Sequence, residues 1–161
     1  MSDAGGKRAS IDRVRDEAAE KRLDITILTM DQSTRTAEDA ANAAGCAVGQ
    51  IVKSLIFNDK NSGGLVLILV SGAHNADLAH LQSVYGLSLD CADAKRVRAE
   101  TGFAIGGVAP IGHLVPLPVY MDEALFIHDV VWCAAGRPDS IFSVAPDALA
   151  EAVAAQRLTV R

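Results

Sequence analysis

Every residue of the run Leu65–Val70 is apolar, which restricts the folds that this chain can adopt. Side chains of a strand alternate between two faces, so a strand that is apolar throughout is expected in the centre of a sheet. The preceding segment, Asn58–Gly64, ends in Asn-Ser-Gly-Gly, which is typical of a hairpin turn. Gln50–Phe57 is therefore predicted as the partner strand of the central one.

Helical patterns alternate with these strands. Ser10 is predicted as the N-cap of a helix that runs to about Arg22, and Thr36 with Asp39 resembles a capping box for a small-residue helix that ends at Gly45. Further helices are expected at 75–85, 93–100 and 146–155, and further strands at 23–29, 129–133 and 140–144. This interleaving predicts the α/β (mixed α+β) fold class.

Length and composition favour one domain over residues 1–161, with residues 1–9 as a flexible N-terminal tail. Half of the residues are hydrophobic but only 4% are aromatic, so the core is expected to be aliphatic. No apolar run approaches the roughly 20 residues of a membrane span, and the N-terminus lacks the apolar core of a signal peptide. We therefore expect a cytoplasmic protein without membrane contacts.

The formal net charge of -5 argues against a protein that coats nucleic acid without specificity. A short basic cluster, Lys95, Arg96 and Arg98, leaves local RNA contacts open, and a solvated helix face is the alternative. Neither the three cysteines nor the four histidines have the spacing of metal ligands, so no metal and no cofactor are expected. The cysteines are predicted to be reduced packing residues.

Lys53 is the most unusual polar residue, because it lies inside an apolar strand. Alternation places it on the face of Ile51, Leu55 and Phe57, and Ser54 on the opposite face. An ammonium group among apolar side chains is costly unless it reaches water or an anion. Lys53 is therefore expected either at the mouth of a pocket or as a protective lysine on an edge strand.

A glycine-rich loop, Gly106–Gly112, is the second unusual feature, within the Gly- and Pro-rich segment 102–118. Glycines let the backbone approach a ligand closely, and Pro110 rigidifies the loop between them. A tight turn without a ligand is the alternative. The spacing is neither that of a dinucleotide fingerprint nor that of a P-loop.

Together these features resemble the YbaK/prolyl-tRNA-synthetase-associated domain family over nearly the whole chain. The matching stretches are Val48–Phe57 around Lys53, Thr101-Gly102-Phe103, the loop Gly106–Gly112, Leu117-Pro118 and Ala134-Ala135-Gly136. The resemblance implies a single domain with a central mixed, curved β-sheet flanked by helices. It also implies a freestanding deacylase that hydrolyses the ester between a wrong amino acid and tRNA, without a metal.

The same resemblance implies which residues form the site. Lys53 and Gly106 are the expected catalytic residues, with Lys53 favoured as an anchor for the RNA end, because a charged lysine is a poor general base. The expected substrate-binding and loop residues are Ser54, Gly107, Pro110, Gly112, His113 and Gly136. Among these, Gly107, Pro110 and Gly112 are expected as loop scaffolding and Gly136 as another loop position near the pocket. His113, which directly follows the loop, is expected at the pocket rim or the tRNA end, and Ser54 is expected to tune the accepted side chain.

The expected substrate is tRNA-Pro charged with alanine, serine, threonine or cysteine, and prolyl-tRNA synthetase is an expected partner. Editing is needed because a synthetase pocket excludes smaller amino acids only weakly. Two alternatives stay open. One is a non-catalytic module that binds aminoacyl-tRNA or the synthetase, and the other is a hydrolase of amino-acid esters that does not need tRNA.

Overall fold

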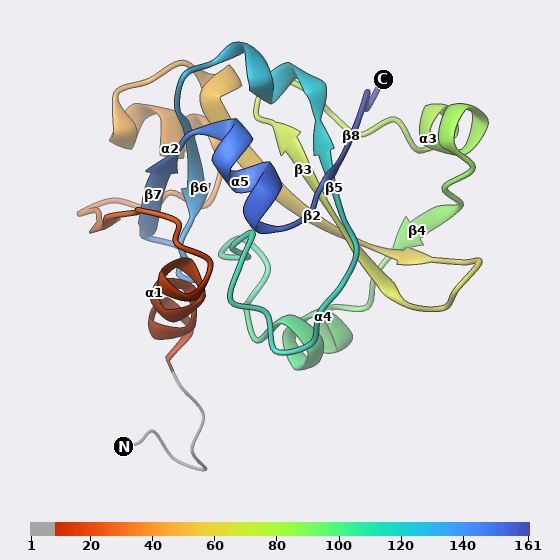
Figure 1. Cartoon of the computed structure of the whole chain (residues 1–161), viewed down its shortest axis with the longest axis horizontal. Coiled ribbons are helices and arrows are strands. Elements are labelled where there is room, and N and C mark those ends of the chain that lie inside the picture. The colour runs from red at the N-terminus through yellow and green to blue at the C-terminus, as the bar shows by residue number, and fades with distance from the viewer. Residues whose placement is uncertain (1–8) are drawn as a thin grey trace.

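The computed structural model describes residues 9–161. The predicted tail at residues 1–9, apart from Ala9, lies outside the described residues. The described chain forms five α-helices and one sheet of eight strands (Figure 1). The helices are α1 (Ser10–Glu20), α2 (Ala37–Ala44), α3 (Leu78–Tyr85), α4 (Ala94–Thr101) and α5 (Pro146–Ala152). The strands are β1 (Ile27–Thr29), β2 (Ile51–Asp59), β3 (Leu65–Ser71), β4 (Leu89–Cys91), β5 (Val119–Asp122), β6 (Val131–Ala134), β7 (Ser140–Val144) and β8 (Gln156–Leu158).

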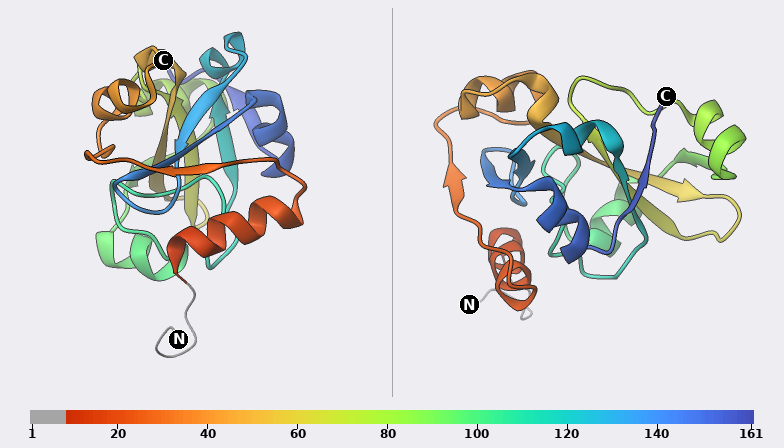
Figure 2. Two further views of the ribbon diagram at one scale, coloured as in Figure 1. Left: turned by 90° about the vertical axis from the view of Figure 1, so that its left-hand side faces the viewer. Right: turned by 45° about the horizontal axis from the view of Figure 1, so that its top comes forward.

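The sheet is mixed and unclosed, with the strand order β1-β7-β6-β2-β3-β5-β8 and with β4 attached to the far end of β2. The hairpin β2–β3 is antiparallel, whereas β2–β6, β3–β5 and β5–β8 are parallel pairs. Helices flank this sheet, as Figures 1 and 2 show. The predicted fold class, with a central mixed and curved sheet, is confirmed.

Strand β3 is the centre of the core, as the apolar run predicts. Each of its residues is buried, and Leu67, Ile68 and Leu69 have no exposed surface. Its two faces contribute to two different hydrophobic clusters, one that contains Leu67 and Leu69 and one that contains Ile68. Burying each of these side chains contributes about 1.5–3 kcal/mol, so β3 anchors the layers on both sides of the sheet.

Local signals place most helix starts correctly. The Thr36 hydroxyl accepts a hydrogen bond from the N–H of Asp39, which confirms the cap of α2. The prediction for α1 is wrong by one residue, because Ala9 is the N-cap. Ser10 is already helical, and its hydroxyl donates instead to the carbonyl of Gly136 at 2.7 Å.

Short elements depart most from the expectations. The predicted strand 23–29 is shorter, β1 at Ile27–Thr29, and β4, β5 and β8 have three or four residues each. The last helix ends at Ala152, where the chain turns through Ala154 in a left-handed conformation, with φ of 52°. Within residues 9–161, no helix has both the length and the apolarity that crossing a membrane requires.

Candidate active site

Strand β2 leaves part of one edge unpaired. It pairs with β3 without interruption from Val52 to Asn58, but its other edge pairs with β6 only at Ile51 and Val52 and with β4 only from Phe57. The N–H of Gly72 donates to the carbonyl of Ile51 on the β3 side. Because backbone groups alternate along a strand, those of Ser54 point to the gap between β6 and β4.

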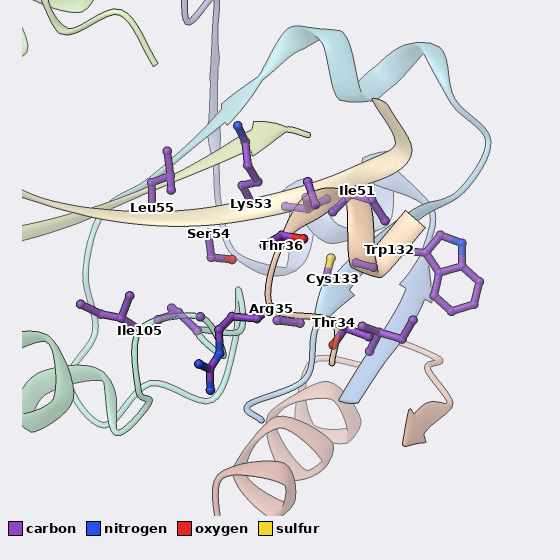
Figure 3. Close-up of a pocket in the computed structure, with 17 residues that line it drawn as sticks. Thr34, Arg35, Thr36, Ile51, Lys53, Ser54, Leu55, Ile105, Trp132 and Cys133 are labelled. Atoms are coloured by element: carbon purple, nitrogen blue, oxygen red, sulfur yellow. The ribbon is translucent and has the colours of Figure 1, made fainter. Parts of the chain in front are cut away.

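A cavity of about 410 Å³ lies at this gap (Figure 3). This volume is in the usual range for small-molecule sites. Four segments line it: the turn and start of α2, the first half of β2, the glycine-rich loop, and β6 with β7. Its lining residues are Thr34, Arg35, Thr36, Ala37, Ala40, Ile51, Val52, Lys53, Ser54, Leu55, Ile105, Gly106, Val108, Trp132, Cys133, Ala134 and Ile141.

The charge of the cavity is opposite to that of the whole protein. Arg35 and Lys53 line it, and within residues 9–161 no aspartate or glutamate is among its lining residues, although the chain carries a formal charge of -5. A cleft lined by one sign of charge raises the local concentration of the opposite charge. The cavity is therefore suited to an anionic ligand.

Ser54 points into the cavity, toward the side on which Arg35 lies (Figure 3). Its hydroxyl oxygen is buried and has no hydrogen-bond partner among the described residues. Buried hydroxyls in native proteins are nearly always paired. The strand has no bulge here, so Lys53 and Ser54 reach one cavity from opposite faces of β2 because the neighbouring strand ends.

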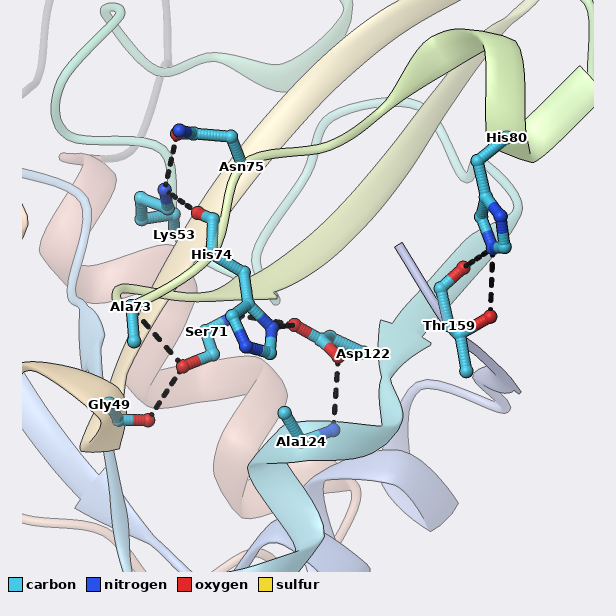
Figure 4. A network of polar contacts seen from close by, with 10 residues as sticks. All are labelled: Gly49, Lys53, Ser71, Ala73, His74, Asn75, His80, Asp122, Ala124 and Thr159. Atoms are coloured by element: carbon cyan, nitrogen blue, oxygen red, sulfur yellow. Dashed lines mark hydrogen bonds and ion pairs between the residues drawn. The ribbon is translucent and has the colours of Figure 1, made fainter. Parts of the chain in front are cut away.

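Lys53 leaves β2 on the side opposite Ser54 (Figure 3). Its ammonium donates to the main-chain carbonyl of His74 and lies 3.5 Å from the side-chain oxygen of Asn75 (Figure 4). Burial lowers the pKa of Lys53, and the negative charge of Asp122 opposes this shift. The lysine is therefore held at the cavity by the turn that follows β3.

Gly106 brings the glycine-rich loop to the cavity. Its φ of +94° is in the left-handed region that favours glycine, and an added Cβ would lie 2.8 Å from Cγ of Arg35. The neighbouring Gly107 does not line the cavity but packs against the backbone of Arg137, which would lie 3.2 Å from an added Cβ. The loop thus approaches Arg35 at one glycine and Arg137 at the next.

The structure does not bring the other predicted site residues to this cavity. Pro110 and His113 line a second cavity of about 230 Å³ beside α1. Gly112 packs against the backbone of Val14, and Gly136 packs against Ser10. The loop's second half is therefore fixed to α1, which Figure 2 shows beside it.

His113 is part of that support. Its Nε2 donates to the carbonyl of Ala109 at 2.7 Å, and its ring meets the ring of Phe103 edge-on, with centroids 5.3 Å apart. Its Nδ1 is buried and has no hydrogen-bond partner among the described residues. Burial, the largest cause, lowers the pKa of His113 to about 4. The imidazole is therefore neutral at neutral pH and stabilises the loop.

Sequence reasoning missed Arg35, Trp132 and Cys133 as cavity residues. Arg35 lies in the polar stretch between the predicted strand and the predicted helix, and its position directly before the N-cap Thr36 is the signal that sequence offers for it. Cys133 forms part of the buried wall, where burial raises the pKa of its thiol, so it is not a reactive nucleophile. The cysteines are free thiols, but Cys91 is exposed, so the packing prediction is wrong for that residue.

Metal-ligating side chains do not cluster in the described part of the chain. Among residues 9–161, no group of three or more histidine, cysteine, aspartate or glutamate side chains is arranged to hold a metal ion. The polar groups that the cavity offers include the Arg35 and Lys53 cations, the Ser54 hydroxyl and unpaired backbone groups. Such groups bind and polarise an ester or a phosphate through hydrogen bonds and charge.

Comparisons with known proteins agree with this chemistry. A family profile described as the aminoacyl-tRNA editing domain matches residues 31–152. A solved structure of a candidate trans-editing enzyme for prolyl-tRNA synthetase is 40% identical, with a TM-score of 0.86 over 97% of this chain and 99% of the other.

Two curated relatives carry related names. A candidate Cys-tRNA(Pro)/Cys-tRNA(Cys) deacylase from Enterococcus faecalis is 28% identical over 71% of this chain and 70% of its own length. A proline–tRNA ligase from Thermosipho africanus is 33% identical over 63% of this chain but only 17% of its own length. The resemblance inferred from Lys53 and the glycine-rich loop is confirmed, and the chain belongs to the aminoacyl-tRNA editing domain family.

Proposed function

We propose that this protein is an aminoacyl-tRNA deacylase that acts in trans on mischarged tRNA-Pro carrying alanine, serine, threonine or cysteine. The main support for this proposal is the composition of the cavity. Two cations, a Ser54 hydroxyl without a hydrogen-bond partner and an unpaired strand edge surround one space, and no carboxylate of the described residues lines it. An RNA end with an ester and nearby phosphates is complementary to such a site.

The reaction is the addition of water to the ester carbonyl. The new C–O bond gives a tetrahedral oxyanion, the bond to the ribose oxygen then breaks, and that oxygen takes a proton to leave as a hydroxyl. In the proposed site, Gly106 supplies backbone groups close to the oxyanion, and the Lys53 ammonium anchors the terminal ribose or phosphate. An activated ester needs orientation and charge stabilisation more than a strong base.

Selection of the amino acid is assigned to the wall around Ser54. The unpartnered Ser54 hydroxyl is free to bind a polar group of the aminoacyl moiety, and the apolar side chains of Val108 and Ile141 limit the space beside it. A second pocket of this kind removes errors that a synthetase pocket admits. The proposed scaffold that holds Gly106 in place consists of Gly107, Pro110, Gly112, His113 and Gly136. Prolyl-tRNA synthetase is the proposed partner.

The test is the release of amino acid from tRNA-Pro charged separately with alanine, serine, threonine, cysteine or proline. The variants are Lys53→Ala and, as a matched control, Lys60→Ala, because Lys60 is an exposed lysine at the end of the same hairpin. We expect the wild type and the control to hydrolyse a mischarged species and to spare prolyl-tRNA. Lys53→Ala should reduce the rate about tenfold or more.

Two results would favour the alternatives. Tight binding of charged tRNA without hydrolysis would indicate a non-catalytic binding module. Equal rates on charged tRNA and on simple amino-acid methyl esters would indicate a hydrolase that does not need tRNA. The positive cavity argues against the second result, because a neutral or cationic small ester gains nothing from Arg35 and Lys53.

A further inference from the structure

We propose that Arg35 forms a phosphate-binding subsite, which holds the phosphodiester on the 5′ side of the terminal nucleoside of the charged RNA. This inference rests on the proposed function, but it concerns a residue that the Lys53 and glycine-loop pattern does not include. The two cavity cations then bind different groups of the RNA end, Arg35 the phosphate and Lys53 the ribose.

The aliphatic part of the Arg35 side chain packs against Gly106. An added Cβ on Gly106 would lie 2.8 Å from Cγ, 3.2 Å from Cδ and 3.3 Å from Nε of Arg35, so the stem lies directly over this glycine. Figure 3 shows the guanidinium beyond it, on the Ser54 side of β2. The cation therefore lies beside the loop that is proposed to hold the ester.

The guanidinium of Arg35 has uncommitted donors. Within residues 9–161 no hydrogen bond or ion pair reaches it, and the residue is exposed. The Lys53 ammonium, in contrast, already donates to the carbonyl of His74 and lies near Asn75. Of the two cations that line the cavity, Arg35 is thus the one that is free to form the pair of parallel hydrogen bonds that phosphate accepts.

The start of α2 adds to the positive potential. Thr36 and Ala37 line the cavity, so the positive end of this helix lies beside Arg35. Glu38 and Asp39 are in the same turn but are not among the lining residues. Arg35 and the helix start together favour a group with negative charge over a neutral one.

The chemistry of the substrate specifies which anion this is. In a charged RNA, the anion nearest to the ester is the phosphate attached to the 5′ oxygen of the same ribose. A cavity that holds the ester between Ser54 and Gly106 therefore brings this phosphate to its rim, one ribose away. Arg35 is the rim cation on that side of β2.

The experiment removes the phosphate and the arginine separately. The substrates are 3′-O-alanyl-adenosine and its 5′-phosphate, and the variants are Arg35→Ala, Arg35→Lys and the control Arg15→Ala, an exposed arginine of α1. For wild type and control, loss of the phosphate should lower kcat/KM about ten- to a hundredfold, as expected for hydrogen bonds to a charged group. In Arg35→Ala the two substrates should differ by less than about threefold, and Arg35→Lys should be intermediate.

A binding measurement makes the test independent of turnover. Trp132 is the single tryptophan of the chain and lines the same cavity. Its fluorescence should report tighter binding of adenosine 5′-monophosphate than of adenosine in the wild type, and equal binding in Arg35→Ala. An inactive wild type that still shows this preference would contradict the proposed function alone. A phosphate preference that survives in Arg35→Ala, or an equal loss of activity on both substrates, would overturn the subsite.

Discussion

Nδ1 of His74 lies 3.1 Å from a carboxylate oxygen of Asp122, and the main-chain carbonyl of the same histidine accepts a hydrogen bond from Lys53. Asp122 also accepts from the N–H groups of Ser71 and Ala124 (Figure 4). A buried carboxylate at the end of β5 thus fixes the turn after β3, and that turn holds the lysine of the proposed site. The position of Lys53 therefore depends on a residue outside the cavity.

Asp122→Ala should destabilise the protein strongly, because it leaves three donors without their common acceptor. Each lost hydrogen bond of a buried group costs about 1–3 kcal/mol, so we expect the free energy of unfolding to fall by about 3 kcal/mol or more. Asp77→Ala is the control, since the exposed Asp77 only caps α3 and its loss costs about 1 kcal/mol. Urea denaturation measures both, and equal losses would show that Asp122 does not hold the turn after β3 in place.

The buried His113 should make stability depend on pH. Its pKa falls from an ordinary 6.5 to about 4 in the folded state, so the unfolded chain binds more protons between these values. This group therefore does not change the free energy of unfolding above pH 6.5. It lowers the free energy of unfolding progressively as the pH falls toward 4, by about 3 kcal/mol in all. In urea denaturation from pH 7 to pH 4, His113→Gln should lose less stability than the wild type, whereas parallel losses would exclude His113 as the cause.

The basic cluster of α4 divides into a structural residue and exposed ones. Arg96 donates to Glu100, to the side chain of Asn58 and to the carbonyl of Gly63, which ties α4 to the β2–β3 hairpin. Arg96→Ala should lower the free energy of unfolding by about 1–2 kcal/mol. Lys95→Ala, at an exposed neighbour, should change it by less than about 0.5 kcal/mol. Thermal denaturation that shifts equally for both variants would contradict this division.

The parts of the fold that were predictable from sequence are those whose signals are local. The apolar run of β3 and the cap at Thr36 depend on neighbouring residues alone, and both are confirmed. Strands β5 and β8 have four and three residues and pair in parallel with distant segments. Their formation depends on a sheet that is already present, so periodicity could not reveal them.

The same distinction between local signals and long-range contacts applies to the cavity. Lys53 stands out because a charge interrupts an apolar strand, and alternation correctly puts Ser54 on the other face. The reason that both residues reach one cavity is the early end of the β2–β6 pairing after Val52. Arg35 joins them through a contact with Gly106, 71 positions later in the chain. No local pattern carries either piece of information.

The proposed place of ester hydrolysis is the cavity beside Gly106. The most direct measurement is the rate of amino-acid release from mischarged tRNA-Pro by Gly106→Ala and by the control Gly86→Ala. Both glycines have positive φ, but an added Cβ meets Arg35 at Gly106 and nothing within 4 Å at Gly86. Each substitution therefore carries a similar backbone strain of about 1–2 kcal/mol, and only one disturbs the cavity.

We predict that Gly86→Ala hydrolyses the ester at close to the wild-type rate and that Gly106→Ala is slower by about tenfold or more, since small displacements of positioning groups have large effects on rate. Equal rates for the two variants, with both folded, would contradict the assignment of hydrolysis to this cavity.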